Sequence, residues 1–311
     1  MINRLGRRAR LLAVVAGCSA LVGACGSTST SKSSTGSPGS GGSGAAPVIK
    51  LDPAAAAQLP AKFKASKVIH VAADASYSPN EFFASDNKTI IGMDVDLAHA
   101  LGQALGVTFT FQNEKFDSIL GSLGTRFDLG ISSFTDTKAR EQQVDMVDYF
   151  SAGTSFMVAA GKNQGLTSLE ALCGKSVAVE TGTTQLDDAS GQSKKCTASG
   201  QPGVAVNSFP DQNGANLALS SGRVAVVMAD SPVNAYAAKQ SHGAFQIVGQ
   251  PYGTAPYGIA VAKGAGYSGL PQALKTALGD LQTSGAYGRI MQKWGVQSGS
   301  VSTFSIDGAS S

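Results

Sequence analysis

The segment Ile131–Arg140 holds the residue types that most directly suggest chemistry, because several hydroxyls precede an arginine. It lies where a predicted strand passes into a predicted helix, so backbone amides and hydroxyls at this point can donate hydrogen bonds to an anion. The planar guanidinium of Arg140 can bind a carboxylate through two parallel hydrogen bonds. A solvated ion pair of Arg140 with Glu141 or Asp136 would use the same residue types. The segment therefore predicts either an anion site or a surface salt bridge.

Two further segments bring polar residues to the end of a predicted strand. Glu180–Gln185 is rich in hydroxyls but lacks the lysine and the glycine spacing of a Walker loop, which disfavours a nucleotide. Val224–Asp230 is an apolar run that ends in a carboxylate, and Pro232 suits the first turn of a following helix. Asp230 either caps that helix or provides an anion for an ammonium group.

The elements that must position these residues alternate along the chain. Short β-branched runs separated by helical stretches predict an α/β fold with mainly parallel sheets. The segment from Gly92 predicts a helix with two carboxylates in its first turn, a leucine face and an end at Gly106. The predicted strands are Val68–Ala73, Val107–Gln112, Phe127–Ser132, Ser155–Ala159, Ser176–Val179, Val204–Asn207, Val224–Met228, Phe245–Val248 and Tyr257–Ala262.

The last sixty or so residues contain one predicted strand and two helical stretches, which are too few elements for a separate domain. The chain is therefore expected to leave a first lobe near Ser155, build a second lobe, and return near Tyr257. This gives a first lobe over residues 61–156, a second lobe over 157–256, and the rest of the first lobe with a C-terminal tail over 257–311. Because the chain passes twice between the two expected lobes, a hinge is expected at these two crossings.

The N-terminus predicts export and attachment to lipid. Residues 1–24 have the basic start and short apolar core of a signal peptide, and the small residues before Cys25 resemble the lipobox of bacterial lipoproteins, in which the cysteine is acylated. Cys18 fits less well because its apolar core would be very short, and an ordinary signal peptide that ends beside a lone cysteine remains an alternative. Residues 25–60 are expected to form a lipid-anchored flexible linker, since residues 26–47 are almost wholly small or polar.

Charge and cysteine content narrow the class of protein further. Without the four leader arginines the chain has 20 basic and 21 acidic residues, so its charge gives no reason to expect a nucleic-acid partner. Cys173 and Cys196 are expected to form a disulfide in an exported domain. Metal binding is the alternative, but the histidines are isolated and no Cys-x-x-Cys occurs, so no metal and no cofactor are expected.

Several motifs occur in the order found in one family. Over roughly residues 67–296 the chain resembles the family 3 extracellular solute-binding proteins, the amino-acid receptors of bacterial ABC importers. One motif departs from the family, which usually has an aromatic or large aliphatic residue where Met93 stands. The motifs are Gly92–Ala98, Phe127–Gly130, Asp148–Phe150, Ala255–Ala260 and Lys293–Gly295.

The resemblance implies a two-lobed periplasmic-binding-protein type 2 fold and a role for each matching residue. Arg140 would bind the α-carboxylate of an amino acid and Asp230 its α-ammonium. Tyr77 and Phe116 would enclose the ligand side chain, although simple core packing would also explain these two aromatics. The other implied ligand contacts are hydroxyls at Ser133, Thr135, Thr183 and Thr184 and carboxylates at Asp74 and Glu180, which lie toward the side-chain end.

The resemblance further implies a monomeric, non-catalytic protein outside the cell membrane that delivers an amino acid to an ABC permease. Two acids near the side-chain end favour arginine, lysine or ornithine, and glutamine is also compatible because Asp74 can accept an amide hydrogen bond. The alternative is an enzyme on the same scaffold, such as a secreted cyclohexadienyl dehydratase, with Glu180 or Asp74 as general acid.

Overall fold

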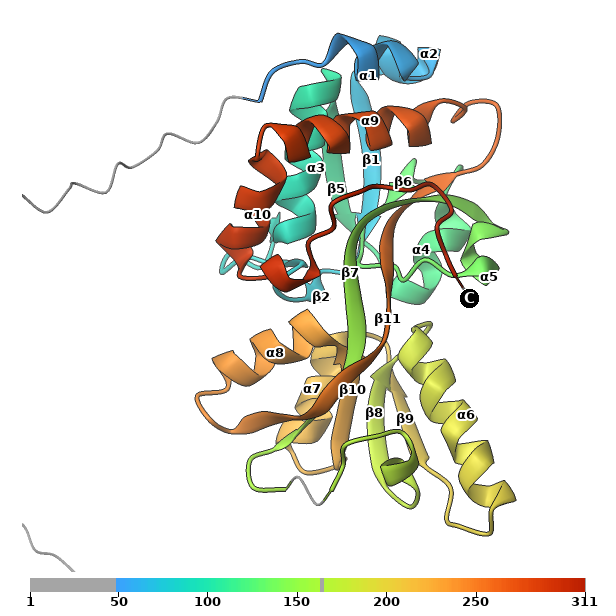
Figure 1. The fold of residues 1–311 in the computed structure, drawn as a ribbon, viewed down its shortest axis with the longest axis vertical. Coiled ribbons are helices and arrows are strands. Elements are labelled where there is room, and N and C mark those ends of the chain that lie inside the picture. The colour runs from blue at the N-terminus through green and yellow to red at the C-terminus, as the bar shows by residue number, and fades with distance from the viewer. Residues whose placement is uncertain (1–48, 163–164, 311) are drawn as a thin grey trace, which may run out of the picture. The chain divides into compact units, whose positions relative to one another are not determined.

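A computed structural model describes residues 49–162 and 165–310. The expected signal peptide and the candidate lipidation sites Cys18 and Cys25 lie outside the described residues. The central feature of the fold is one eight-stranded sheet with the strand order β5-β1-β6-β11-β7-β10-β8-β9. Its two long strands, β7 (Val144–Ala159) and β11 (Phe245–Ala262), pair antiparallel and run through the middle of Figure 1. These two strands connect the two lobes of the α/β fold.

Lobe 1 contains the sheet edge formed by β5 (Thr108–Asn113), β1 (Val68–Ala73) and β6 (Leu129–Gly130), which are parallel to one another. The predicted strand at 68–73 is therefore confirmed with its bounds. Helices cover this edge in Figure 1. They are α1 (Pro53–Gln58), α2 (Ala61–Ser66), α3 (Met93–Leu105), α4 (Phe116–Ser122), α5 (Lys138–Glu141), α9 (Leu270–Thr283) and α10 (Ala286–Trp294), followed by the short 3-10 helix η2 (Gln297–Gly299).

The predicted helix from Gly92 to Gly106 is confirmed as α3. It ends at Gly106, whose φ of 67° lies in the left-handed region that glycine adopts without strain. Its apolar face is buried against the sheet and α9 through side chains that include Leu97, Leu101 and Leu105. Burial of this face fixes the orientation of the helix and of the two carboxylates in its first turn.

Lobe 2 contains the opposite sheet edge, formed by β8 (Ser176–Glu180), β9 (Ala205–Phe209) and β10 (Val226–Asp230), which are again parallel. Its helices are η1 (Glu170–Leu172), α6 (Thr184–Ala198), α7 (Gln212–Ser220) and α8 (Ser231–Gln240). Cys173 and Cys196 form the expected disulfide, with their Cα atoms 5.6 Å apart. This bond ties the residue after η1 to the last turn of α6.

The structure differs from the expected elements in several strand regions. β7 begins at Val144 rather than at Ser155, and β6 covers only Leu129–Gly130 of the strand predicted at 127–132. The segments predicted as separate strands at 245–248 and 257–262 belong to the single strand β11, which continues through register shifts between Val248 and Tyr252 and again at two later points. A small antiparallel sheet of β2 (Ser76–Tyr77), β3 (Glu81–Phe83) and β4 (Ile90–Ile91) was not expected, because strands of two or three residues carry almost no periodic signal.

Helix α1 lies within residues 25–60, the range expected to be a flexible linker. Ala55 is fully buried and Leu59 nearly so, and both belong to the hydrophobic core that α3 and α9 share. Residues 53–58 are therefore part of the folded unit, since they bury enough apolar surface to remain ordered. In the described part of the chain, no helix is both long and apolar enough to cross a membrane.

Candidate functional site

Arg140 lies in α5, and its guanidinium points toward lobe 2. The helix begins after Thr137, whose hydroxyl accepts a hydrogen bond from the Arg140 amide. Arg140 Nη1 donates to the Thr135 carbonyl at 2.7 Å, and Nη2 donates across to the Gly182 carbonyl at 3.2 Å. Among the described residues Glu141 pairs instead with Lys138, at 2.8 Å, and Arg140 forms no ion pair within 4.0 Å. The structure therefore does not support the surface salt bridge that the sequence left open.

Asp230 is the last residue of β10 and stands at the N-cap position of α8, but its side chain makes no capping hydrogen bond. Its carboxylate instead accepts from the Tyr77 hydroxyl at 3.0 Å and from Gln185 Nε2 at 2.8 Å. Burial raises the pKa of Asp230, while these hydrogen bonds and Arg140 act in the opposite direction. The helix-cap explanation therefore does not account for this carboxylate.

Asp74 and Glu180 bring two buried carboxyls together from different lobes. Asp74 follows β1 and accepts from the backbone amides of Ser76 and Phe116, at 3.1 and 3.2 Å. Glu180 ends β8, and its Oε1 atom is buried without a hydrogen-bond partner. Burial, followed by the charges of Asp74 and other nearby acids, raises the pKa of Glu180, and burial likewise raises the pKa of Asp74. A cation placed here would relieve this repulsion.

Phe116 and Tyr77 contribute different contacts, although the sequence suggested the same role for both. Phe116 stacks on Phe134 with ring centroids 4.6 Å apart, and the Arg140 guanidinium carbon lies 5.5 Å from the Phe116 centroid. The Tyr77 ring is buried, and its hydroxyl reaches Asp230 in lobe 2. Tyr77 therefore connects the two lobes through its polar end.

One small cavity collects nine of the ten residues proposed from the sequence as ligand contacts. Asp74 is the exception. Its carboxyl is close enough to act on the charge of Glu180, but it does not line the cavity. The enclosed space is about 10 Å³, enough for about one water molecule. The lining residues are Tyr77, Phe116, Ser133, Thr135, Arg140, Glu180, Thr183, Thr184, Gln185 and Asp230.

Gln185 lines the same cavity but was not expected from the sequence. It lies in the first turn of α6, and its Nε2 donates to Thr154 at 2.9 Å and to Asp230 at 2.8 Å. Its position directly after two threonines that were expected to bind was the only available signal. An amide at that point of a helix has no pattern of its own that distinguishes it from a surface residue.

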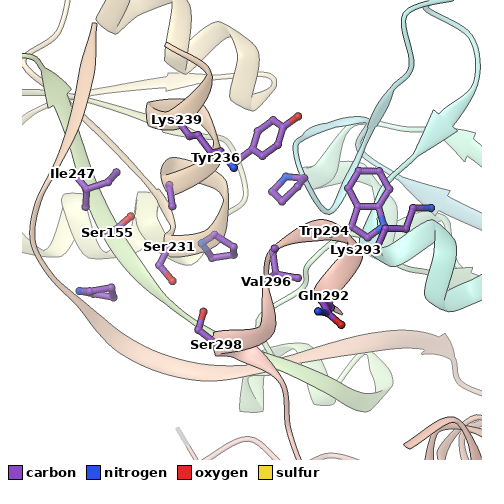
Figure 2. A pocket seen from close by; sticks show the side chains of 15 residues that line it. Ser155, Ser231, Tyr236, Lys239, Ile247, Gln292, Lys293, Trp294, Val296 and Ser298 are labelled. Atoms are coloured by element: carbon purple, nitrogen blue, oxygen red, sulfur yellow. The ribbon is translucent and has the colours of Figure 1, made fainter. Parts of the chain in front are cut away.

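A larger groove of about 750 Å³ lies elsewhere, beside α8 and the end of α10. Figure 2 shows Tyr236 and Lys239 on α8 facing Lys293 and Trp294. None of the residues expected to bind ligand lines this groove, and its described lining contains no acidic side chain. The groove therefore does not suit a cationic ligand, whereas the smaller cavity does.

A family model for the bacterial extracellular solute-binding proteins, family 3, matches residues 69–297, which is most of the chain. The chain belongs to this family. The arginine-binding protein ArgT of Corynebacterium glutamicum is 35% identical to this solute-binding protein over 246 residues, which cover 78% of this chain and 79% of the relative. A putative ABC transporter arginine-binding protein of Escherichia coli is 32% identical and covers 74% of this chain and 91% of its own length.

Solved structures agree with the fold of this solute-binding protein. An ancestral arginine-binding protein bound to arginine has a TM-score of 0.66 and 35% identity, over 73% of this chain and 98% of that one. An ancestral amino acid-binding protein described as a precursor of cyclohexadienyl dehydratase has a TM-score of 0.64 and 29% identity, over 75% of this chain and 97% of that one. The structure thus has the two-lobed periplasmic-binding-protein type 2 fold that the sequence motifs implied.

The cavity carries charges that can pair with a small zwitterion. Arg140 from lobe 1 offers a fork for a carboxylate, and Asp230 from lobe 2 offers an acceptor for an ammonium group. Glu180 adds a second carboxyl within the cavity, and the Asp74 carboxyl lies near Glu180 outside the cavity lining. Acidic groups therefore outnumber the one guanidinium among the described residues of this site.

Proposed function

We propose that this protein binds a basic L-amino acid, with arginine as its main ligand, and delivers it to the permease of an ABC importer. The observation that supports the proposal most strongly is one cavity lined by Arg140 from one lobe and Asp230 from the other. Beside it lie Glu180 and Asp74, which form no ion pair with any described residue. The charges in this cavity match an amino acid whose side chain carries a second positive charge.

The two charged ends of an amino acid lose their water when they enter such a site, and an unpaired buried charge costs several kcal/mol. In the proposal Arg140 pairs with the α-carboxylate, with help from hydroxyls at Ser133, Thr135, Thr183 and Thr184. Asp230 pairs with the α-ammonium. The Arg140 side chain is already held by the Thr135 and Gly182 carbonyls, so part of its ordering cost is met before ligand arrives.

At the side-chain end, Glu180 and Asp74 would bind the ligand cation. A guanidinium is planar and offers several donors, so it can serve both carboxyls at once, whereas the ammonium of lysine or ornithine is a compact charge. Relatives of this chain named as arginine-binding proteins agree with this preference. Glutamine is the second candidate, because a related ancestral arginine-binding protein has been solved with glutamine bound.

The small volume of the cavity supports binding by hinge closure. An amino acid is far larger than one water, so the lobes must separate at β7 and β11 to admit the ligand and then close on it. Ligand that contacts both lobes stabilises the closed form, and that form is the one presented to the permease. We further propose that the protein acts as a monomer outside the cell membrane, held there by a lipid on Cys25.

Titration calorimetry of the folded domain with the twenty common amino acids and ornithine tests the proposal. Arginine should bind most tightly, lysine and ornithine more weakly, and acidic amino acids not at all. Tight binding of an acidic or purely apolar amino acid would contradict the assignment of Glu180 and Asp74. Binding of glutamine above arginine would support the second candidate.

The enzyme alternative is tested in parallel, since one structural relative is described as a precursor of a cyclohexadienyl dehydratase. Glu180 has the raised pKa that a general acid requires, and the neighbouring Asp74 and Asp230 carboxylates could act as bases, so turnover must be measured directly. Incubation with prephenate should give no turnover. Turnover that disappears in Glu180→Gln would favour the enzyme.

A further inference from the structure

Two carboxyl groups lie deep in lobe 1 and contact Ser133, one of the residues that line the cavity. Glu81 comes from β3 and Asp94 from the first turn of α3, and both side chains are completely buried. Among the described residues neither carboxyl forms an ion pair with a lysine, arginine or histidine. Buried carboxyls without a cation must be stabilised by hydrogen bonds or by a proton.

Glu81 holds the two serines of the ligand loop. Ser132 Oγ donates to Glu81 Oε1 at 3.0 Å, and Ser133 Oγ donates to Glu81 Oε2 at 3.2 Å. Ser132 Oγ in turn accepts from the Asp74 backbone amide at 2.9 Å. Glu81 thus helps to position the cavity residue Ser133, whose hydroxyl also accepts from Asn80 Nδ2 at 2.9 Å, and the backbone that carries Asp74.

Asp94 holds the same loop from its other side. Its Oδ2 accepts from the Ser133 backbone amide at 3.2 Å, and its Oδ1 accepts from the Tyr149 hydroxyl at 2.7 Å. Ser133 has a φ of 52°, in the left-handed region that is unfavourable for residues other than glycine. The hydrogen bonds that Ser133 donates to both carboxyls therefore offset the strain of this conformation.

Burial favours a proton on this pair of carboxyls. Burial, followed by the charge of Asp94, raises the pKa of Glu81 well above its usual range, and burial raises the pKa of Asp94 to about 6. Asp74 also faces Glu81 and adds to the repulsion. Protonated Glu81 can donate to ionised Asp94, which leaves each carboxyl with a partner.

We propose that Glu81 and Asp94 are positioning residues for ligand binding: as a hydrogen-bonded carboxyl pair they hold Ser133 and the Asp74 backbone in the geometry that the ligand requires. Neither side chain lines the cavity, so neither touches ligand. This inference rests on the proposed amino-acid binding. The two positions differ in the hydrogen bonds they require. The side chain at position 81 must donate to Asp94, whereas at position 94 both side-chain oxygens must accept, from the Ser133 amide and the Tyr149 hydroxyl.

The test compares Glu81→Gln and Asp94→Asn in calorimetric titrations with arginine, below the unfolding temperature of each variant. Glutamine keeps a donor toward Asp94 but only one of the two oxygens that accept from Ser132 and Ser133, so Glu81→Gln should raise the Kd by only about threefold. Asparagine places N–H groups against donors, so Asp94→Asn should weaken binding by about tenfold or more. Glu170→Gln, the same change at an exposed carboxylate, is the matched control and should leave Kd unchanged.

If Asp94→Asn does not fold, Ser132→Ala provides the same test, because it removes the link between Glu81 and the Asp74 amide. It should weaken arginine binding about threefold to tenfold, whereas the control Ser118→Ala, at an exposed serine, should not. Wild-type affinity in Asp94→Asn or, in its place, Ser132→Ala would overturn the positioning role. If Glu81→Gln raised the Kd for arginine as much as Asp94→Asn does, or more, the assignment of the proton to Glu81 would be overturned. Absence of amino-acid binding by the wild type would instead refute the proposed function.

Discussion

At the scale of single residues, the guanidinium of Arg140 is central to the proposed site. Arg140→Ala should weaken arginine binding by about 3–5 kcal/mol, because the ligand carboxylate would remain buried without a partner. In calorimetry this loss would take a micromolar wild-type Kd to about the millimolar range. Arg126→Ala is a suitable control, since its side chain is 62% exposed and pairs with Glu114 outside the cavity. Retained micromolar affinity in Arg140→Ala would contradict the carboxylate assignment.

Asp230 should be equally important at the opposite end of the ligand. Asp230→Asn leaves one acceptor where the carboxylate now receives two hydrogen bonds, and it removes the charge that faces the α-ammonium. We expect a loss of about 3–5 kcal/mol in binding free energy by calorimetry. Asp86→Asn, the same substitution at an exposed residue between β3 and β4, should have little effect. A change below about 1 kcal/mol in Asp230→Asn would place the ammonium elsewhere.

Glu180 should make arginine binding depend on pH. Its pKa in the free protein is raised by burial and neighbouring acids, and a bound guanidinium would lower it. Arginine affinity should therefore rise with pH toward the pKa of the free protein, with release of a proton, and then level off. Calorimetry between about pH 5 and 8 measures both effects, over a range in which an unperturbed carboxyl is already ionised.

Glu180→Gln should abolish the part of this dependence that comes from Glu180 and should shift preference toward glutamine, because an amide side chain can serve a ligand amide. Glu170→Gln, at an exposed carboxylate, controls for general effects of charge. A wild-type profile that persists in Glu180→Gln would assign the titration to another group, with Asp74 as the nearest candidate.

Element by element, the sequence predicts best where one periodic pattern is strong. β1 and α3 were predicted closely because an apolar run and a leucine face each give a clear period. β11 was predicted as two strands, since its middle contains two glycines, two prolines and a change of register that only pairing with β7 reveals. The first half of β7 was missed because Asp145 and Asp148 interrupt its apolar pattern. Asp148 is buried there with Ser305 of the C-terminal tail as its partner, which no local signal indicates.

The loop between β8 and α6 allows a test at the element scale. Gly182 has a φ of 83°, and a Cβ at this position would lie 2.8 Å from the Cβ of Asp117 in the other lobe. Gly200 has a similar φ of 76° but has open space around it. Gly182→Ala and Gly200→Ala should both lose about 1 kcal/mol of unfolding free energy in chemical denaturation.

The two alanine variants should differ in ligand binding. Gly182→Ala should also weaken arginine binding, because the added methyl group keeps the lobes apart, whereas Gly200→Ala should bind as the wild type does. Equal affinities would show that contact between Gly182 and Asp117 is not needed in the ligand-bound state.

For the whole molecule, the site depends on residues from both lobes that only the fold brings together. The sequence motifs identified nine of the ten residues that line the cavity. They did not reveal that Tyr77 reaches Asp230 across the lobes, or that Gln185 also binds Asp230, because these contacts depend on how β2 and α6 each approach the end of β10. The Glu81–Asp94 pair was missed for the same reason, since β3 is too short to be predicted.

Because ligand is expected to contact both lobes, it should stabilise the folded domain as one unit. At a free concentration one hundred times Kd, arginine should add about 2.7 kcal/mol to the free energy of unfolding. For a domain of this size that corresponds to a rise of roughly 5–10 °C in Tm by differential scanning calorimetry. Arg140→Ala, which should be almost unbound at this concentration, serves as the control and should show almost no rise. If arginine shifted the Tm of Arg140→Ala as much as that of the wild type, stabilisation would come from nonspecific solution effects, and ligand capture between the lobes would lose its support.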